Sequence, residues 1–196
     1  MSAALAHKRV PDPGQRVVRI VAGECHVTDA AELIGTTLGS CISACVRDRR
    51  TGVGGMNHFM LPQTSRDAHE ADLQELRYGV HAMEYLVNEV LRRCGERRSD
   101  LEVKLVGGGE LLGLGPGVGL RNREFVHRFL EDAGIAVAAA DLGGPHGRVV
   151  RYLPSTGQLF VRALSGGRAR SVVALEQDYR ERIAARRPRQ DAVELF

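Results

Sequence analysis

The sequence predicts an α+β fold, a layered α/β sandwich of mixed, mainly antiparallel sheet with two or three helices. Short apolar runs of strand length recur along the chain between glycine-containing turns, whereas only two segments show a clear helical period. So few helices cannot cross over between every pair of strands, which argues against a doubly wound parallel sheet. The 196 residues, 43% of them hydrophobic, suffice for one domain with a buried core.

The expected strands begin near the N-terminus. Basic and apolar residues alternate over residues 16–22, and a second short strand follows at 25–28. Apolar runs at 41–46 and 53–60 flank the polar turn 48–52, which indicates a hairpin. The remaining strands are expected at 101–106, 135–140, 149–153 and 158–163, and a tight turn joins the last two.

Two helices follow from apolar residues spaced three and four apart. The first spans residues 73–94 and ends near Gly95, and the second spans 121–133 and ends at Gly134. A third helix is expected to begin the charged C-terminal segment. We expect a disordered arm at 1–15, a catalytic or binding domain at 16–175 and a basic tail at 176–196.

Composition narrows the classes of function. No apolar run reaches the roughly 18–20 residues of a membrane span, and the N-terminus lacks the pattern of a signal peptide, so we expect a cytoplasmic protein without membrane insertion. The net charge of +3 is mild and no nucleic-acid module is recognisable, so no nucleic-acid binding is expected. No two histidines and a carboxylate show metal spacing, which predicts no metal and no cofactor.

The cysteines stand at positions 25, 41, 45 and 94, without C-x-x-C spacing, and no disulfide is expected without a secretory signal. Cys41 differs from the others because Gly39 and Ser40 precede it in a small, flexible turn. Free backbone N–H groups in such a turn can stabilise the oxyanion that forms when a thiolate adds to a carbonyl. Cys45, on the same strand face, and Cys94, at the end of the helical stripe, are expected in the core.

A cysteine nucleophile needs a base, because a free thiol has a pKa of about 8.5. His58 lies on the next predicted strand, so pairing of the two strands would bring it to Cys41 at one end of the sheet. Asn57 would point to the opposite face of a regular strand. A histidine in an apolar run is more often structural than catalytic, so the residues alone leave both interpretations open.

A run of three glycines, 107–109, follows the predicted strand at 101–106. A phosphate-binding loop would require a lysine after it, but Glu110 and Leu111 follow instead. We therefore interpret the run as backbone that passes close to another element.

The segments around Cys41 and His58 resemble the two signature blocks of the CheD chemoreceptor glutamine deamidase family. They are Leu-Gly-Ser-Cys at 38–41 and Gly-Gly-Met-Asn-His-Phe-Met-Leu-Pro at 54–62, in the family's order and spacing. Further similar blocks lie at 106–109, 119–122 and 141–144, the last leading to Gly-Arg at 147–148. The resemblance extends from residue 16 to residue 165. It implies a fold similar to that of the deamidating bacterial toxins.

The resemblance implies a protein-glutamine deamidase of bacterial chemotaxis. Its catalytic residues would be Cys41, His58 and a threonine shortly before the cysteine, either Thr36 or Thr37. The substrates would be glutamines of methyl-accepting chemotaxis receptors, converted to glutamate through a cysteine thioester, with glutamyl methylesterase as a side activity. Because these glutamines lie on helical coiled coils, we expect a groove that accepts a helix. The candidate substrate-binding residues are Gly39, Ser40, Asn57, Gly108, Asn122 and Arg148.

The family also implies a second partner, a CheC-type chemotaxis phosphatase, and we expect the chain to be a monomer. Two alternatives stay open on the sequence. A cysteine peptidase or small-molecule amidase would use the same dyad and would turn over peptide bonds or free glutamine. A non-catalytic binding module would instead function normally after Cys41→Ala.

Overall fold

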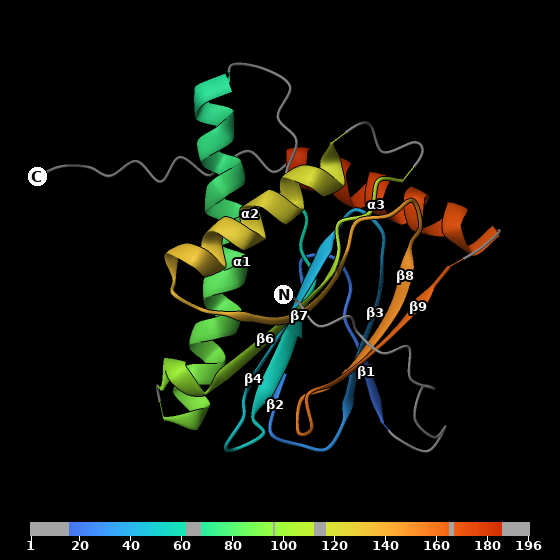
Figure 1. The fold of residues 1–196 in the computed structure, drawn as a ribbon. Helices are drawn as coiled ribbons and strands as arrows, with labels where there is room; N and C mark the ends of the chain where they lie inside the picture. Colours follow the sequence, from blue (N-terminus) through green and yellow to red (C-terminus); the bar gives the residue numbers. More distant parts are fainter. Residues whose placement is uncertain (1–15, 62–67, 96, 112–116, 165–166, 186–196) are drawn as a thin grey trace, which may run out of the picture.

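The computed structural model describes residues 16–61, 68–95, 97–111, 117–164 and 167–185, which form two sheets and three α-helices (Figure 1). The strand order is β1-β3-β8-β9 in one sheet and β2-β5-β4-β6-β7 in the other. Neighbouring strands are antiparallel except for the pairs β1–β3 and β6–β7. The mixed sandwich predicted from the sequence is confirmed. The arm expected at 1–15 lies outside the described residues.

The four-stranded sheet contains one strand that the sequence analysis did not predict. This strand, β3, pairs with β1 in parallel and with β8 in antiparallel register, with Thr36 opposite Val150. Gly35, Thr36 and Thr37 interrupt its apolar pattern, so the ladders on both sides, rather than local hydrophobicity, define it as a strand. The strands of this sheet are β1 (Val17–Arg19), β3 (Leu33–Leu38), β8 (Arg148–Leu153) and β9 (Gln158–Ala163).

The five-stranded sheet follows the sequence predictions more closely. The hairpin expected between residues 41 and 60 is the antiparallel pair β4–β5, and β6 continues the sheet on the other side of β4. The strands are β2 (Cys25–Thr28), β4 (Ile42–Asp48), β5 (Gly54–Asn57), β6 (Leu101–Gly107) and β7 (Val137–Leu142).

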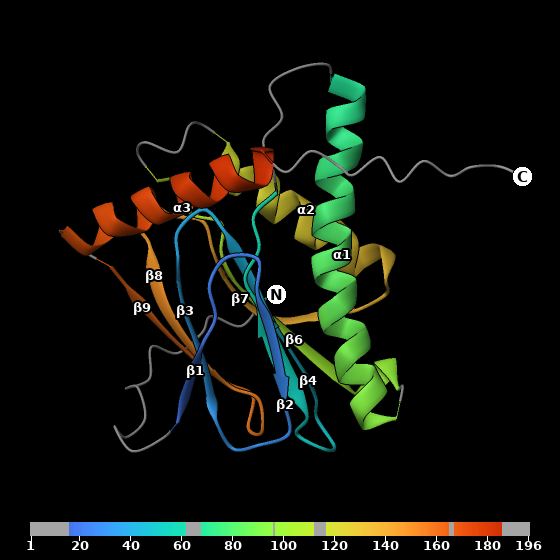
Figure 2. The same cartoon turned by 180° about the vertical axis from the view of Figure 1, so that it is seen from behind.

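Helices α1 (Ala68–Cys94) and α2 (Val118–Asp132) cover one face of the five-stranded sheet, and a short 3-10 helix spans Arg98–Asp100. Helix α3 (Gly167–Ala185) lies across the ends of the strands, as Figures 1 and 2 show from opposite sides. The domain boundary predicted at 175/176 therefore falls inside a helix. Within the described ranges, none of the helices has the length and apolar character that crossing a membrane requires.

The sandwich has two main cores, one on each face of the five-stranded sheet. The core under α1 and α2 contains Ile42 and Phe59, and the core between the two sheets contains Cys41 and Cys45. Successive strand residues point to opposite faces, so neighbouring positions 41 and 42 enter different cores. Cys41 is thereby directed at the second sheet and away from α1 and α2.

Candidate active site

Strand pairing brings Cys41 and His58 together. Ile42 pairs with Phe59 in an antiparallel bridge, and both side chains pack under the helices. The residues that precede them, Cys41 and His58, therefore point the other way, into the space between the sheets. Cys41 Sγ lies within 4.8 Å of a ring nitrogen of His58, and both residues are buried. The two strands thus form the contact that the dyad hypothesis required.

The hydroxyl of Thr36 determines which nitrogen of His58 carries the proton. Thr36 Oγ1 lies 2.8 Å from the carbonyl oxygen of Ile20 and 2.8 Å from His58 Nδ1. A carbonyl can only accept, so the single hydroxyl proton goes to Ile20 and His58 Nδ1–H donates to Thr36. Nε2 is then unprotonated, and within the described part of the chain it is buried without a hydrogen-bond partner. It is the nitrogen that can accept the proton of Cys41.

The alternation of β3 separates the two candidate threonines. Thr36 points inward with Ile34 and Leu38, which belong to the core between the sheets, whereas Thr37 is exposed on the other face. Only one of two consecutive strand residues can face the His58 ring. The two threonines could not be separated from the sequence because their segment was not predicted as a strand.

Three consecutive backbone N–H groups, the last of them that of Cys41, point at one carboxylate, that of Glu176 from α3. Gly39 N and Cys41 N donate to Glu176 Oε1 at 2.7 and 3.2 Å. Ser40 N and Ser40 Oγ donate to Oε2 at 2.9 and 2.7 Å. Glu176 is only 3% exposed. Converging donors next to a nucleophile are the arrangement that stabilises the oxyanion of a tetrahedral intermediate.

The same turn, residues 39–41, is held from its opposite side through its carbonyl groups. Gly109 N donates to the first carbonyl at 2.7 Å, Asn122 Nδ2 to the second at 2.8 Å and Gly108 N to the third at 2.7 Å. Asn122 Oδ1 in turn accepts from Leu61 N at 2.9 Å. Because all three carbonyl groups are held by hydrogen bonds, the N–H groups of the turn stay oriented toward Glu176. The turn therefore needs no reorganisation to bind an oxyanion there.

The glycine run allows this close approach of backbones. Gly107 and Gly108 have φ values of 116° and 62°, in the region that side chains other than glycine rarely adopt. A Cβ atom on Gly107 would overlap the carbonyl oxygen of Cys41, and one on Gly119 would overlap the carbonyl oxygens of Gly108 and Gly109. The interpretation of 107–109 as backbone passing close to another element is confirmed.

Burial controls the protonation of the pair. Burial raises the pKa of the Cys41 thiol well above its ordinary value, and the Glu176 carboxylate raises that pKa further. Burial lowers the pKa of His58 to about 4, although Glu176 and Glu24 oppose this shift. The pair is therefore a neutral thiol beside a neutral imidazole at pH 7.

Cys41, His58 and Glu176 together also resemble a set of metal ligands, since their ligating atoms lie within 4.8 Å of one another. The carboxylate oxygens, however, accept hydrogen bonds from three backbone N–H groups and one hydroxyl. The positive ends of these dipoles attract an anion and repel a cation. The electrostatics of the site therefore suit a carboxylate or an oxyanion.

Two other predicted substrate-binding residues are engaged in the framework. Asn57 Oδ1 accepts from Ala44 N at 2.9 Å, and its Nδ2 donates to Ala82 O on α1 at 3.0 Å. Arg148 donates to Asp141 Oδ1 at 3.0 Å and braces the loop at 141–148. Contact of Asn57 or Arg148 with substrate stays a prediction.

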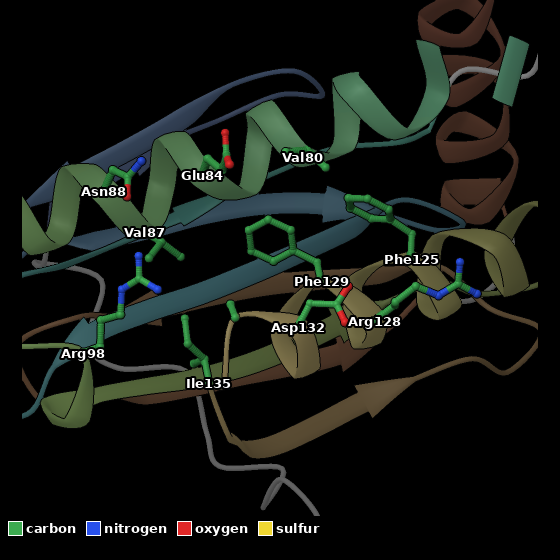
Figure 3. A pocket seen from close by; sticks show the side chains of 11 residues that line it. Val80, Glu84, Val87, Asn88, Arg98, Phe125, Arg128, Phe129, Asp132 and Ile135 are labelled. Carbon is green, nitrogen blue, oxygen red and sulfur yellow. The ribbon is translucent and has the colours of Figure 1, made fainter. Parts of the chain in front are cut away.

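Two surface hollows lined by described residues lie against α1, and neither is lined by Cys41. The first, of about 520 Å³, lies between α1 and α2; Val87, Phe129 and Ile135 line it together with charged side chains such as Glu84 and Arg98 (Figure 3). The second, of about 550 Å³, lies between β1, β2 and α1 and is lined in part by His58. The sulfur side of the dyad is instead covered by α3.

Glu176 is the site residue that the sequence analysis missed. It was expected to begin a basic tail, and no role was given to it. The available signal is a stripe in which four residues are spaced four, three and four positions apart, as on one face of a helix. The stripe consists of Val172, Glu176, Tyr179 and Ile183, all buried.

Comparison with known proteins identifies the family. The family model described as CheD chemotactic sensory transduction matches residues 60–163. A probable chemoreceptor glutamine deamidase CheD of Hahella chejuensis is 42% identical over 188 residues, covering 95% of this chain and 88% of the relative. A protein of the same name from Halorhodospira halophila is 45% identical over 191 residues, covering 94% and 88%. Among solved structures, the hypothetical protein YfiH of Bacillus licheniformis matches distantly, with a TM-score of 0.40 and 13% identity over 73% of this chain and 61% of that chain. The chain belongs to the CheD family.

Proposed function

We propose that this protein is a cysteine-dependent protein-glutamine deamidase that acts on chemoreceptors. The observation that carries the proposal is that Cys41, beside the unprotonated Nε2 of His58, adjoins three N–H groups that already hold a glutamate side chain. Glutamate is the product of glutamine deamidation, so the site is complementary to the product and to the oxyanion that precedes it. The names of the relatives support chemoreceptors as the substrate class.

The first half of the reaction forms a thioester. The Sγ–H proton of Cys41 moves to His58 Nε2 while Sγ adds to the Cδ atom of a receptor glutamine. The carboxamide oxygen becomes an oxyanion and accepts from the N–H groups of residues 39–41. His58 then gives its proton to the departing amide nitrogen, so that ammonia leaves as the C–N bond breaks.

The second half hydrolyses the thioester. Water loses a proton to His58 Nε2 and adds to the thioester carbon, and a second oxyanion forms in the same donor site. The C–S bond then breaks, Cys41 recovers its proton and the glutamate product leaves. The hollow of about 550 Å³ that reaches His58 gives water a route to the histidine.

Thr36 is the positioning threonine in this proposal. Its hydroxyl receives the Nδ1–H of His58, which keeps the ring in the tautomer with a basic Nε2. A glutamyl methyl ester would follow the same course with methanol in place of ammonia as the leaving group. Methylesterase activity is therefore expected as a side reaction.

The proposal is tested by peptide mass spectrometry of a receptor cytoplasmic fragment incubated with wild-type protein, Cys41→Ala and Cys45→Ala. Cys45 is the matched control, because it is a fully buried cysteine on the same strand face. We expect glutamine-to-glutamate conversion with wild type and Cys45→Ala, and a loss of about a thousandfold or more with Cys41→Ala. Conversion by Cys41→Ala at the wild-type rate would exclude the thioester mechanism.

The assay also separates the alternatives. Turnover of free glutamine or of peptide bonds would favour a small-molecule amidase or a peptidase. Folded wild-type protein that converts no receptor fragment would favour a binding module. Association with a CheC-type phosphatase and a monomeric state are further expectations, and both are measured by light scattering of the protein alone and mixed with that phosphatase.

A further inference from the structure

Helix α3 is held on the domain by a stripe with a carboxylate in its middle. Val172, Glu176, Tyr179 and Ile183 are 3%, 3%, 8% and 9% exposed. Spacings of four and three residues are those with which a helix of a coiled coil presents its seam to a partner. Helix α3 therefore packs on the domain as one helix of a coiled coil packs on another, except that the second position of its stripe is a glutamate.

The contacts beneath α3 place the donor site between two groups of apolar side chains. On one side of the site, Val172 packs with Leu111 and Leu164. On the other side, Tyr179 packs with Ile183 in the core between the sheets, and the Tyr179 hydroxyl contacts that of Tyr78 on α1. A helix in this position places one side chain beside Cys41 and apolar side chains on both sides of it.

The group that α3 places there has the chemistry of the reaction product. Both oxygens of Glu176 accept hydrogen bonds from the turn at 39–41, and one of them lies within 4.8 Å of Cys41 Sγ. A carboxamide has only one acceptor oxygen, so in the same pose its NH₂ group would face N–H donors. The resting site therefore favours a carboxylate over the amide substrate.

We propose that α3 is an internal copy of the modified receptor helix: it occupies the substrate seat, with Glu176 in the position of the newly formed glutamate. This inference rests on the deamidase function proposed above. The enzyme is closed while α3 is seated, because the donors of the oxyanion site are occupied and Cys41 is covered. A receptor helix gains access only by displacing α3.

The surface that α3 occupies also defines the kind of helix that binds in its place. A glutamine at position i of a substrate helix takes the place of Glu176. Positions i−4, i+3 and i+7 then take the places of Val172, Tyr179 and Ile183, so apolar residues are preferred there. This pattern is a stripe on one face of a receptor coiled coil.

The variant Glu176→Gln converts α3 from a product copy into a substrate copy. We expect the enzyme to deamidate its own residue 176, so that purified Glu176→Gln carries glutamate there, as detected by fragment-ion mass spectrometry. Gln177 is the internal control, because it lies next to position 176 on α3 and is expected to remain an amide. The double variant Cys41→Ala with Glu176→Gln is expected to keep both amides.

The outcomes distinguish this inference from the function on which it rests. Conversion at position 176 that needs Cys41 and spares Gln177 supports the product-copy role of α3. An amide that persists at position 176 in folded Glu176→Gln protein, while that protein still deamidates a receptor fragment, overturns the role and leaves the deamidase function intact. If wild-type protein does not convert the receptor fragment and Glu176→Gln also keeps its amide at position 176, the proposed function itself is overturned.

A second measurement tests whether α3 closes the site. Glu176→Ala frees the donor site, and we expect kcat/KM on a receptor fragment and the rate of Cys41 alkylation by iodoacetamide to rise at least about tenfold, on the scale of one lost charged contact. Glu181→Ala, which removes the same side chain from an exposed position of α3, is expected to match wild type. Equal rates for wild type and Glu176→Ala would overturn the closed-site role.

Discussion

Helices α1 and α3 both cover the sandwich, but they are attached in opposite ways. The described part of α1 buries an apolar face, with Met83, Leu86 and Val90 fully enclosed in the core over the five-stranded sheet. Helix α3 buries a stripe whose second member, Glu176, is charged and bonded to backbone donors. An apolar contact needs only exclusion of water, whereas a buried carboxylate depends on its specific partners.

The difference shows which helix can leave without unfolding the domain. Removing α1 would expose a core in which Ile42 and Phe59 also take part. Removing α3 would uncover the part of the core between the sheets where Tyr179 and Ile183 pack, and it would return a carboxylate to water, where it is well solvated. We therefore expect α1 to belong to the cooperative fold and α3 to be a cover with a lower local free energy of opening.

The largest expected effect is the difference in the free energy of unfolding between a truncation on α1 and a truncation on α3. Met83→Ala should lower the free energy of unfolding by about 2–5 kcal/mol, because it leaves a cavity in a fully buried site. Ile183→Ala on α3 should lower it by only about 1 kcal/mol and should instead accelerate alkylation of Cys41, since the helix opens locally. Urea denaturation and timed alkylation measure the two quantities. A larger loss of unfolding free energy in Ile183→Ala than in Met83→Ala would contradict the assignment of α1 to the core and of α3 to a cover.

The region beneath α3 should also make stability depend on pH through His58. Its pKa is about 4 in the folded protein and 6.5 without burial, so between these values the unfolded chain binds a proton that the folded chain does not. The free energy of unfolding should therefore fall as pH falls from 6.5 to about 4. The size is about 3–4 kcal/mol, given these two pKa values and about 1.4 kcal/mol for each unit of pKa.

Urea denaturation of wild type, His58→Gln and Met83→Ala across this pH range isolates the contribution of His58. His58→Gln should show a weaker pH dependence than wild type, because the group that titrates between the two states is gone. Met83→Ala, which alters the core under α1, should keep the wild-type dependence. An unchanged slope in His58→Gln would assign the effect to other groups.

A smaller effect concerns the two threonines of β3. Thr36→Val keeps the shape and the strand propensity of the side chain but removes the acceptor for His58 Nδ1–H. We expect kcat on a receptor fragment to fall about ten- to a hundredfold, as for other residues that orient a histidine, with little change in KM. Thr37→Val, at the exposed neighbouring position, should match wild type. Similar losses in both variants would indicate a general effect on β3.

The smallest expected effect concerns the side-chain contact that joins α3 to α1. Tyr179→Phe removes only the hydroxyl that joins α3 to Tyr78 of α1. A neutral hydrogen bond contributes about 1 kcal/mol, so Cys41 alkylation should accelerate severalfold while the free energy of unfolding changes by no more than this amount. Tyr85→Phe on α1, at a half-exposed position, is the matched control and should leave the alkylation rate unchanged.

The sequence predicted most of the fold because its strands and helices carry strong local patterns. The hairpin β4–β5, the hairpin β8–β9 and helices α1 and α2 all follow from apolar spacing and turn residues. Strand β3 was missed because Gly35 and two threonines weaken its pattern and its partners lie far along the chain. Without β3, the alternation that separates Thr36 from Thr37 could not be applied.

The candidate site was predictable where its residues share one hairpin. Cys41 and His58 lie on neighbouring strands, so local reasoning brings them together. Glu176 lies 137 positions from Gly39, and a glutamate in a charged segment ordinarily faces solvent. Its burial depends on backbone donors that exist only after β4, β6 and α2 have assembled around the turn at 39–41.

The position of Glu176 in the chain also orders events during synthesis. Helix α3 follows every strand that the structure describes, and N-terminal segments leave the ribosome first. The turn at 39–41 and its supports can therefore assemble while the helix that covers them is still being made. Under the proposed function, Cys41 and His58 can therefore meet in a new molecule before α3 is in place, and the arrival of α3 then covers them.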